Sequence, residues 1–198
     1  MISKLSKKVV SRFISCGNIT ENEQELYEYG IFILLSNILF ISLTIIIGLV
    51  FGLFLQSLIF FSVFTIIRQY AGGYHASTES RCEIITTLGF LVSIVTMRLI
   101  DNNLAFTILL ISSMVLFVFI FSFAPIDTDE KPLNEEELNV FCKRTKIILV
   151  IVLATIIVSL CLNLKMICIP CCMSLILEGI LLLAGKAQKL KAISCESN

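Results

Sequence analysis

The chain has 198 residues, of which 57% are hydrophobic and 15% are charged, and its mean hydropathy is +0.97. Soluble domains carry about 45–50% apolar and about 25% charged residues, so this composition excludes an ordinary soluble enzyme, a disordered chain and a fibre. The 15 basic and 15 acidic side chains cancel, which gives no indication of a nucleic-acid partner. The composition therefore predicts a membrane protein with several spans.

Residues 1–18 are predicted to form an amphipathic helix at the membrane surface, in contact with anionic lipid. The apolar side chains of this segment fall on one helical stripe: Ile2, Leu5, Val9, Phe13 and Cys16. The basic side chains lie largely off that stripe, and no apolar run follows them, which argues against a signal peptide. A frayed basic tail is the alternative. Thr20 and Glu23 then match a capping box, which predicts the start of the first spanning helix.

Six spanning helices are predicted from the apolar runs, because one crossing needs about 20 apolar residues. The first run, Ile31–Ile67, contains no charged residue or histidine and is long enough for two spans, with a turn marked by Gly48, Gly52 and Gln56. The predicted spans are 31–50, 53–67, 84–100, 104–124, 147–164 and 166–185. The expected fold is an all-α, polytopic membrane helix bundle forming one domain over 1–198, with one long polar loop at Pro125–Lys146.

The basic residues predict the orientation of these spans. With six spans, thirteen basic side chains fall on one side of the membrane, and only Arg98 and Lys165 fall on the other. If Ile31–Ile67 were a single span, the two sides of the membrane would carry six and nine basic side chains, which is hardly a bias. Since Lys and Arg gather in cytoplasmic segments, both termini are expected in the cytoplasm.

The segment between the second and third predicted spans holds the candidate chemistry. It contains the only histidine, His75, and Cys82 follows seven residues later. A thiolate can attack a peptide carbonyl while an imidazole takes the thiol proton and returns it to the leaving amine. On one unbroken helix the two side chains would lie about 10 Å apart along the axis. The segment must therefore bend at Gly72 and Gly73, with His75 ending the second span or lying in the turn.

Ser77, Thr78 and Ser80 are good N-cap residues, and Ser80 and Glu83 match a capping box. If the third span starts there, Cys82 lies in its first turn. The helix N-terminus and neighbouring Arg81 would favour the thiolate there. Glu79 and Glu83 could orient His75, or serve only as helix N-terminal charges. The alternative is that His75 is a polar loop residue and Cys82 a small filler.

Two segments resemble the accessory gene regulator B (AgrB) family of bacterial quorum-sensing peptidases. The first is RQYAGGYH from Arg68 to His75, followed by Cys82; the second is APIDTDEKPL, which begins at Ala124. The resemblance implies a cysteine endopeptidase of the bacterial cell membrane, active at the cytoplasmic side, homodimeric, and without metal or other cofactor. Cys82 would be the nucleophile and His75 the general base and acid, and Arg68 and Gly73 match positions that matter in the family.

The implied substrate is a small precursor peptide of the AgrD type. Its acidic C-terminal tail would be removed through a thioester on the enzyme, and an internal Cys or Ser of the peptide would close a thiolactone or lactone ring. This is a step toward an autoinducing peptide. The tail is expected to bind to basic side chains among Arg68, Arg81, Lys143, Arg144 and Lys146. These residues could equally be ordinary cytoplasmic charges.

Two further features support other functions. Cys168, Cys171 and Cys172 form a C-x-x-C-C motif that could be a redox dithiol but is expected to consist of small packing residues. The same packing interpretation applies to Cys16, Cys142, Cys161 and Cys195, although Cys16 and Cys195 could be lipidated. Glu178 lies inside the sixth span, where a carboxylate could belong to a proton path or bond within the bundle. The alternative function is a small multi-span transporter or peptide exporter without covalent catalysis.

Overall fold

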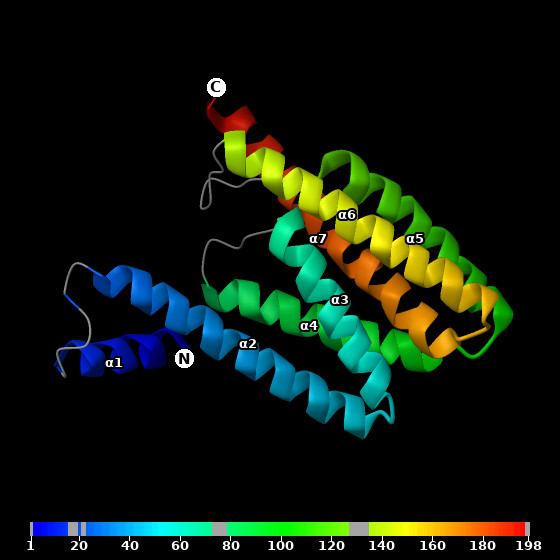
Figure 1. Cartoon of the computed structure of the whole chain (residues 1–198), viewed down its shortest axis with the longest axis horizontal. Coiled ribbons are helices and arrows are strands. Elements are labelled where there is room, and N and C mark those ends of the chain that lie inside the picture. Colours follow the sequence, from blue (N-terminus) through cyan, green and yellow to red (C-terminus); the bar gives the residue numbers. More distant parts are fainter. Residues whose placement is uncertain (1, 16–19, 21–22, 73–78, 127–134, 197–198) are drawn as a thin grey trace. The chain divides into compact units, whose positions relative to one another are not determined.

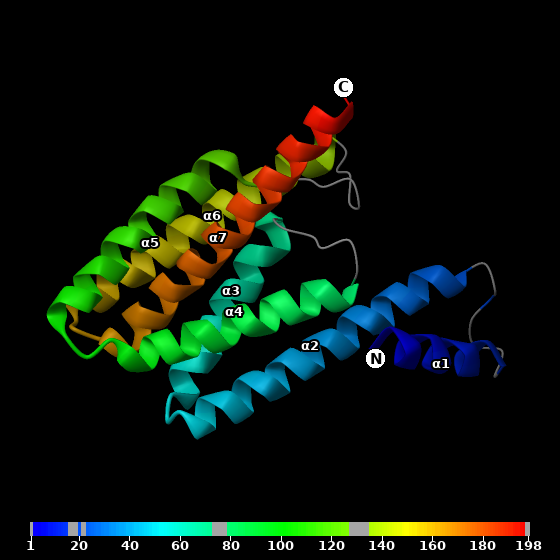
Figure 2. The same ribbon diagram turned by 180° about the vertical axis from the view of Figure 1, so that it is seen from behind.

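The computed structural model describes residues 2–15, 20, 23–72, 79–126 and 135–196, and the side chains of these except at 2, 79–83, 135 and 189–196. They form seven helices (Figures 1 and 2): α1 (Ile2–Ser15), α2 (Gln24–Val50), α3 (Phe54–Ala71), α4 (Glu79–Leu99), α5 (Asn103–Phe123), α6 (Glu135–Cys161) and α7 (Lys165–Glu196). The chain divides into two compact units, Met1–Ile46 and Ile47–Asn198, which are described separately.

The first unit holds α1 and most of α2. The predicted N-terminal helix is confirmed, and its apolar side chains Leu5 and Phe13 are exposed, as a helix that rests on lipid requires. Before α2, the Glu23 carboxylate accepts hydrogen bonds from the backbone N–H (3.2 Å) and the hydroxyl (2.7 Å) of Thr20. These bonds hold the pKa of the exposed Glu23 carboxyl below its ordinary value. The predicted pairing of Thr20 with Glu23 at the start of α2 is therefore confirmed.

The second unit is built around α7. Of the candidate membrane windows, that of α7 is 67% buried, against 28% or less for the others. It packs against α3, α4, α5 and α6, and consecutive helices alternate in direction (Figures 1 and 2). Ser174 of α7 donates a hydrogen bond to the carbonyl of Phe60 in α3 (3.0 Å). Further along both helices Glu178 approaches Arg68, so α3 and α7 run in the same direction.

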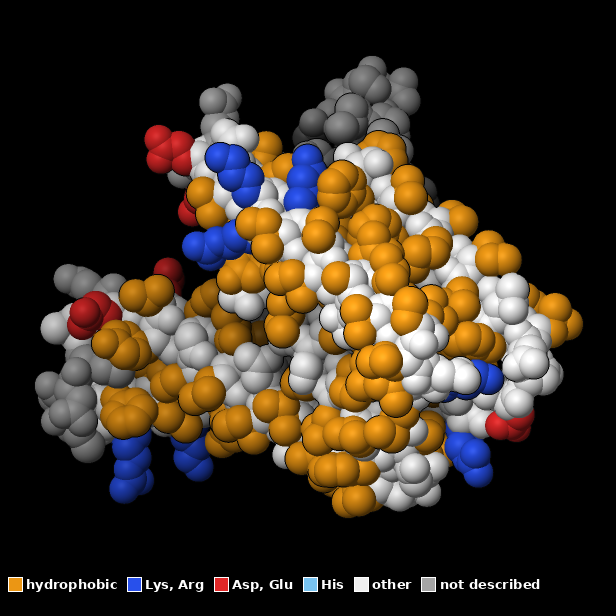
Figure 3. All heavy atoms as spheres, turned by 45° about the vertical axis from the view of Figure 1, so that its right-hand side comes forward, with side chains coloured by type: hydrophobic (Ala, Val, Ile, Leu, Met, Phe, Trp, Pro, Cys, Tyr) orange, Lys and Arg blue, Asp and Glu red, His pale blue; other side chains and the backbone are white. Residues whose placement is uncertain are grey.

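The all-α membrane bundle predicted from the sequence is confirmed. Five helices are long and apolar enough to cross a membrane, namely α2, α3, α5, α6 and α7. The sixth, α4, has a shorter apolar part, Ile84–Leu99, so six spans remain a prediction. Large apolar side chains are exposed along these helices, and Figure 3 shows them over most of the visible surface. Such a surface is stable against lipid and unstable in water.

Several helices extend beyond the predicted spans. The predicted polar loop Pro125–Lys146 is wrong in its second half, because α6 begins at Glu135. Three successive glutamates, Glu135–Glu137, form the first turn of α6, where acidic side chains favour a helix start. α3 continues past the predicted end at 67 to Ala71, and α7 continues past 185 to Glu196. Polar and charged helical turns carry no hydropathy signal, which explains these differences.

Three short turns close one end of the second unit, and we call it the turn end: 51–53, 100–102 and 162–164. Gly52 (φ 66°) and Asn163 (φ 57°) each end a helix in a left-handed conformation. In both turns the next residue's N–H bonds back to a carbonyl five positions earlier, Leu53 to Gly48 (2.7 Å) and Leu164 to Ser159 (2.8 Å). This is the Schellman arrangement. The predicted turn at Gly52 is confirmed.

Candidate functional site

At the opposite end of the second unit, the end of α3 meets the segment after α5. We call this the Gly72 end. Arg68 Nη1 donates a hydrogen bond to the Gly72 carbonyl (2.9 Å), and the Ile126 N–H donates to the Ala71 carbonyl (3.1 Å). Gly72 and Ile126 form an isolated parallel bridge, preceded by a cis Ala124–Pro125 peptide bond. The described parts of the two segments that resemble the AgrB family therefore lie side by side.

Gly72 can hardly be replaced at this contact. Its backbone has φ 72° and ψ −139°, a conformation that side chains with a Cβ rarely adopt. A Cβ at this position would also collide with the carbonyl oxygen of Ile126. The sequence therefore needs glycine here for two separate reasons, its backbone angles and the close approach of a second segment.

Arg68 also faces the interior of the bundle. Its Nη1 lies 3.8 Å from Oε1 of Glu178 in α7, and the two side chains are 20% and 0% exposed. Within the described part of the chain, neither Glu178 oxygen has a hydrogen-bond partner. Of the two roles considered for Glu178, a proton path or a bond within the bundle, the structure shows a contact within the bundle, and it is an ion pair and not a hydrogen bond. Sequence reasoning missed this pairing, although an acidic residue inside a span signals the need for a cationic partner.

The start of α6 brings further cationic groups to the Gly72 end. Arg144 Nη1 lies 3.4 Å from Tyr70 Oη, and its guanidinium carbon lies 5.4 Å from the centre of the Tyr70 ring. Phe141 packs edge-on against the same ring, with 5.7 Å between centres. Lys143 and Arg144 are both exposed. Of the predicted tail-binding residues, Arg144 therefore touches α3 next to Arg68, and Lys143 presents its charge to solvent.

The backbone of Cys82 lies in the first turn of α4, as predicted, because that helix begins at Glu79. Ser80 lies inside this turn, so its predicted role as the cap is wrong, and the other two N-cap candidates, Ser77 and Thr78, lie outside the described residues. α3 itself ends at Ala71, and the position of His75, at the end of the second span or in the turn, stays a prediction. His75 and Gly73 lie outside the described residues, as do the side chains of Arg81 and Cys82. Contact between imidazole and thiol thus stays a prediction.

The cysteine motif of α7 belongs to the core. Cys168, Cys171 and Cys172 are free and buried, as packing residues would be, whereas Cys161 is exposed and does not fit the packing interpretation. Among the residues that the structure describes, no three His, Cys, Asp or Glu side chains gather as metal ligands would. At the turn end, Arg98 and Asp101 are exposed, as expected for interfacial charges.

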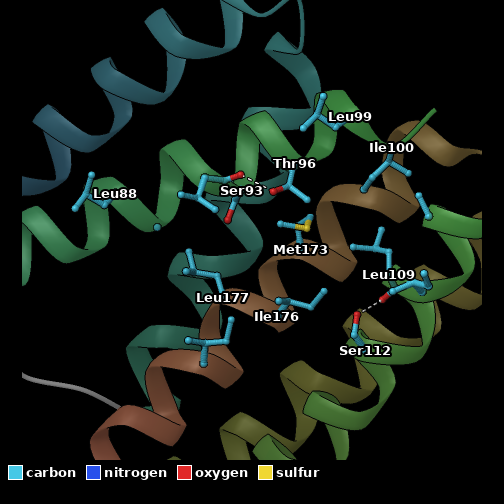
Figure 4. A pocket seen from close by; sticks show the side chains of 15 residues that line it. Leu88, Ser93, Thr96, Leu99, Ile100, Leu109, Ser112, Met173, Ile176 and Leu177 are labelled. Carbon is cyan, nitrogen blue, oxygen red and sulfur yellow. Dashed lines mark hydrogen bonds between the residues drawn. The ribbon is translucent and has the colours of Figure 1, made fainter. Parts of the chain in front are cut away.

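A cavity of about 640 Å³ lies between α4, α5 and α7 (Figure 4). Leu88 of α4, Leu109 of α5 and Leu177 of α7 line it, together with the hydroxyl-bearing residues Ser93, Thr96 and Ser112. Two of these hydroxyls donate to carbonyls of their own helices, Thr96 to Val92 (2.7 Å) and Ser112 to Leu109 (3.0 Å). The lining of α4 begins six residues beyond Cys82 and runs toward the turn end. On α7 the lining includes Leu177 and Ile180, which lie on either side of Glu178 in the sequence.

Comparison with known proteins identifies one family. The family model described as Accessory gene regulator B matches residues 3–182. A relative named "Putative AgrB-like protein 2", from Clostridium perfringens (strain 13 / Type A), is 33% identical over 145 residues, which cover 69% of this chain and 66% of that protein. The match thus spans just under two thirds of that relative. A "Putative AgrB-like protein" from Listeria monocytogenes serovar 1/2a is 29% identical over 154 residues, covering 77% and 74%. No solved structure matches.

Proposed function

The chain belongs to the AgrB family, and we propose that it is a membrane-embedded cysteine endopeptidase that cleaves and cyclises a small AgrD-type precursor peptide. Family membership gives it a role in the accessory gene regulator quorum-sensing system and a link to AgrD-type peptides. The helices make it a multi-pass membrane protein. The proposed assembly is a homodimer in the bacterial cell membrane, with both termini and the site in the cytoplasm.

The proposed reaction is an acyl transfer in two steps. The Cys82 thiolate attacks the scissile carbonyl; a C–S bond forms, the C–N bond breaks, and His75 passes the thiol proton to the leaving amine. An internal Cys or Ser of the peptide then attacks the thioester. Its sulfur or oxygen bonds to the carbonyl carbon, and Cys82 leaves and recovers a proton through His75. Bonds and protons balance without an oxidant, a metal or another cofactor.

The observation that carries this proposal is the position of Cys82 in the first turn of α4, within the matched family segment. The first backbone N–H groups of a helix have no partner in the helix, and the helix dipole is positive there. Both effects stabilise a thiolate and the oxyanion that forms on the attacked carbonyl. His75 lies in the connection between α3 and α4, whose start is fixed by the Gly72 contact with Ile126.

A site at the edge of the membrane also suits the second step. Exchange of one thioester for another is nearly balanced in energy, whereas hydrolysis is strongly downhill. The enzyme must therefore keep water from the intermediate and hold the attacking group close to it. We propose that the acidic tail binds to Lys143 and Arg144, because both charges are exposed on α6 and Arg144 contacts Tyr70 at the end of α3.

The decisive test replaces the nucleophile. Cys82→Ser in vesicles that receive a synthetic precursor should lower the rate of tail release by about 1,000-fold or more, since the thiolate and its proton transfer are lost together. Binding of the precursor should persist, and mass spectrometry of wild type should detect a peptide thioester on Cys82. His75→Ala should have a similar effect.

Cys161→Ser is the matched control, because Cys161 is an exposed cysteine at the end of α6 in the turn end. This variant should retain wild-type activity. A transporter without covalent chemistry would tolerate Cys82→Ser as well as Cys161→Ser, and that result would exclude the peptidase.

A further inference from the structure

Glu178 is the buried acidic group that the proposed reaction does not use. It lies within the membrane window of α7, and its side chain is 0% exposed. A carboxylate without a partner at such depth is costly, whereas an apolar side chain of similar size would pack at no such cost. Buried ion pairs are weak sources of stability, and in some proteins they instead specify one arrangement of the packed elements.

The arrangement begins with the two groups that the Arg68 guanidinium joins. Its Nη1 lies 3.8 Å from the Glu178 carboxylate and 2.9 Å from the Gly72 carbonyl. One rigid group thus connects the middle of α7 with the residue at which the chain leaves α3. A planar guanidinium can serve two acceptors in fixed directions, which a lysine ammonium does less well.

The connection continues to the next segment. Ala71, the last residue of α3, accepts the Ile126 N–H at 3.1 Å, and Gly72 forms a bridge with Ile126. Glu178, Arg68, Gly72 and Ile126 therefore form a continuous series of contacts across α7, α3 and the segment after α5. The conformation in which α3 ends at Gly72 is therefore held by this series.

We propose that Glu178 is a positioning residue that acts through Arg68 to fix the exit of the chain from α3, and with it the approach of His75 to Cys82. This inference rests on the proposed function for its effect on the reaction, but its effect on the backbone can be measured separately. Without the carboxylate, the guanidinium loses the ion pair that holds it against α7, and the Gly72 carbonyl loses a donor fixed in place.

The first test is a double-mutant cycle on tail release. Glu178→Gln should lower kcat by about ten- to a hundredfold and leave KM within about twofold, because a small displacement of reacting groups costs this much without weakening binding. Glu178→Gln added to Arg68→Gln should cause no further loss, because Glu178 acts through Arg68. Glu178→Asp, which keeps the charge, should recover part of the activity. The proposal would be overturned if the kcat losses of the two single variants multiply in the double variant. It would also be overturned if Glu178→Asp recovers no activity.

The second test does not require peptidase activity. The amide hydrogen of Ile126 should exchange faster in Glu178→Gln than in wild type, because its acceptor on Ala71 is no longer held in place. Ser174→Ala is the matched control: Ser174 is equally buried one turn earlier on α7 and bonds to α3, but it does not touch Arg68. It should change neither the Ile126 exchange nor kcat. Unchanged Ile126 exchange in Glu178→Gln would overturn the proposal even if the peptidase assignment stands.

Discussion

The two ends of the α3–α7 bundle are built in different ways. At the turn end, the short connections are closed by residues near in sequence: Gly52 and Asn163 in left-handed conformations, and Asn102, whose side chain accepts the Ala105 N–H (2.7 Å). At the Gly72 end, the contacts join residues far apart in the chain, such as Arg68 with Glu178 and Gly72 with Ile126. Local caps predominate at the turn end, where Lys165 Nζ of α7 also lies 3.4 Å from Asn103 Oδ1 of α5, and contacts between distant segments predominate at the Gly72 end.

This difference has a functional consequence. A local cap stabilises its own helix, and its loss costs about 1 kcal/mol wherever the helix ends. Contacts between distant segments instead determine where several helix ends lie relative to one another. A reaction that needs groups from two different helix ends therefore depends on the contacts of the Gly72 end. Changes at the turn end should affect its rate very little.

The difference between the Gly72 end and the turn end is tested most strongly at two glycines with positive φ, one at each end. Gly72→Ala should lower tail release by more than about tenfold and destabilise the protein by roughly 1–3 kcal/mol, because the added Cβ adopts a strained conformation and displaces the Ile126 carbonyl. Gly52→Ala has comparable φ but meets no atom within 4 Å, so it should cost about 1 kcal/mol and leave tail release within about twofold. Thermal unfolding in detergent and the vesicle assay measure both effects. Equal activities of the two variants would remove the distinction between the ends.

A smaller effect is expected from charge reversal at the Gly72 end. Lys143→Glu together with Arg144→Glu should raise KM for the precursor about five- to tenfold and change kcat little, because exposed charges attract the acidic tail before reaction. The difference in KM between the double variant and wild type should become smaller at high salt. Lys165→Glu, at the turn end, is the control and should leave KM unchanged. An unchanged KM in the double variant would exclude this binding surface.

The smallest effect is predicted for the turn end itself. Asn102→Ala removes the side-chain oxygen that accepts the Ala105 N–H at the start of α5 and should cost about 1 kcal/mol of stability. Tail release should stay at the wild-type rate. Loss of activity without loss of stability would mean that the turn end also contributes to the reaction.

The outcome of the sequence predictions follows the same division. The span predicted at 104–124 matches α5 (Asn103–Phe123) within one residue, and the turn at Gly52 is correct, because apolar runs and left-handed turns have local signals. The helical start of α6 was missed, because Glu135–Lys146 is polar and lies outside the apolar run. Cys82 was placed correctly in the first turn of α4, but Ser80 was wrongly made its cap.

By itself, the sequence determined that the chain is an all-α membrane bundle, and it placed the proposed reactive residues His75 and Cys82 between the second and third predicted spans. Burial of apolar helices in lipid and glycine at left-handed turns are properties of short segments, which a sequence displays directly. Only the tertiary structure decided that Glu178 pairs with Arg68 and that Ile126 meets Gly72. These residues lie on different helices and segments, and their pairing depends on how α3, α5 and α7 pack, which no local pattern records.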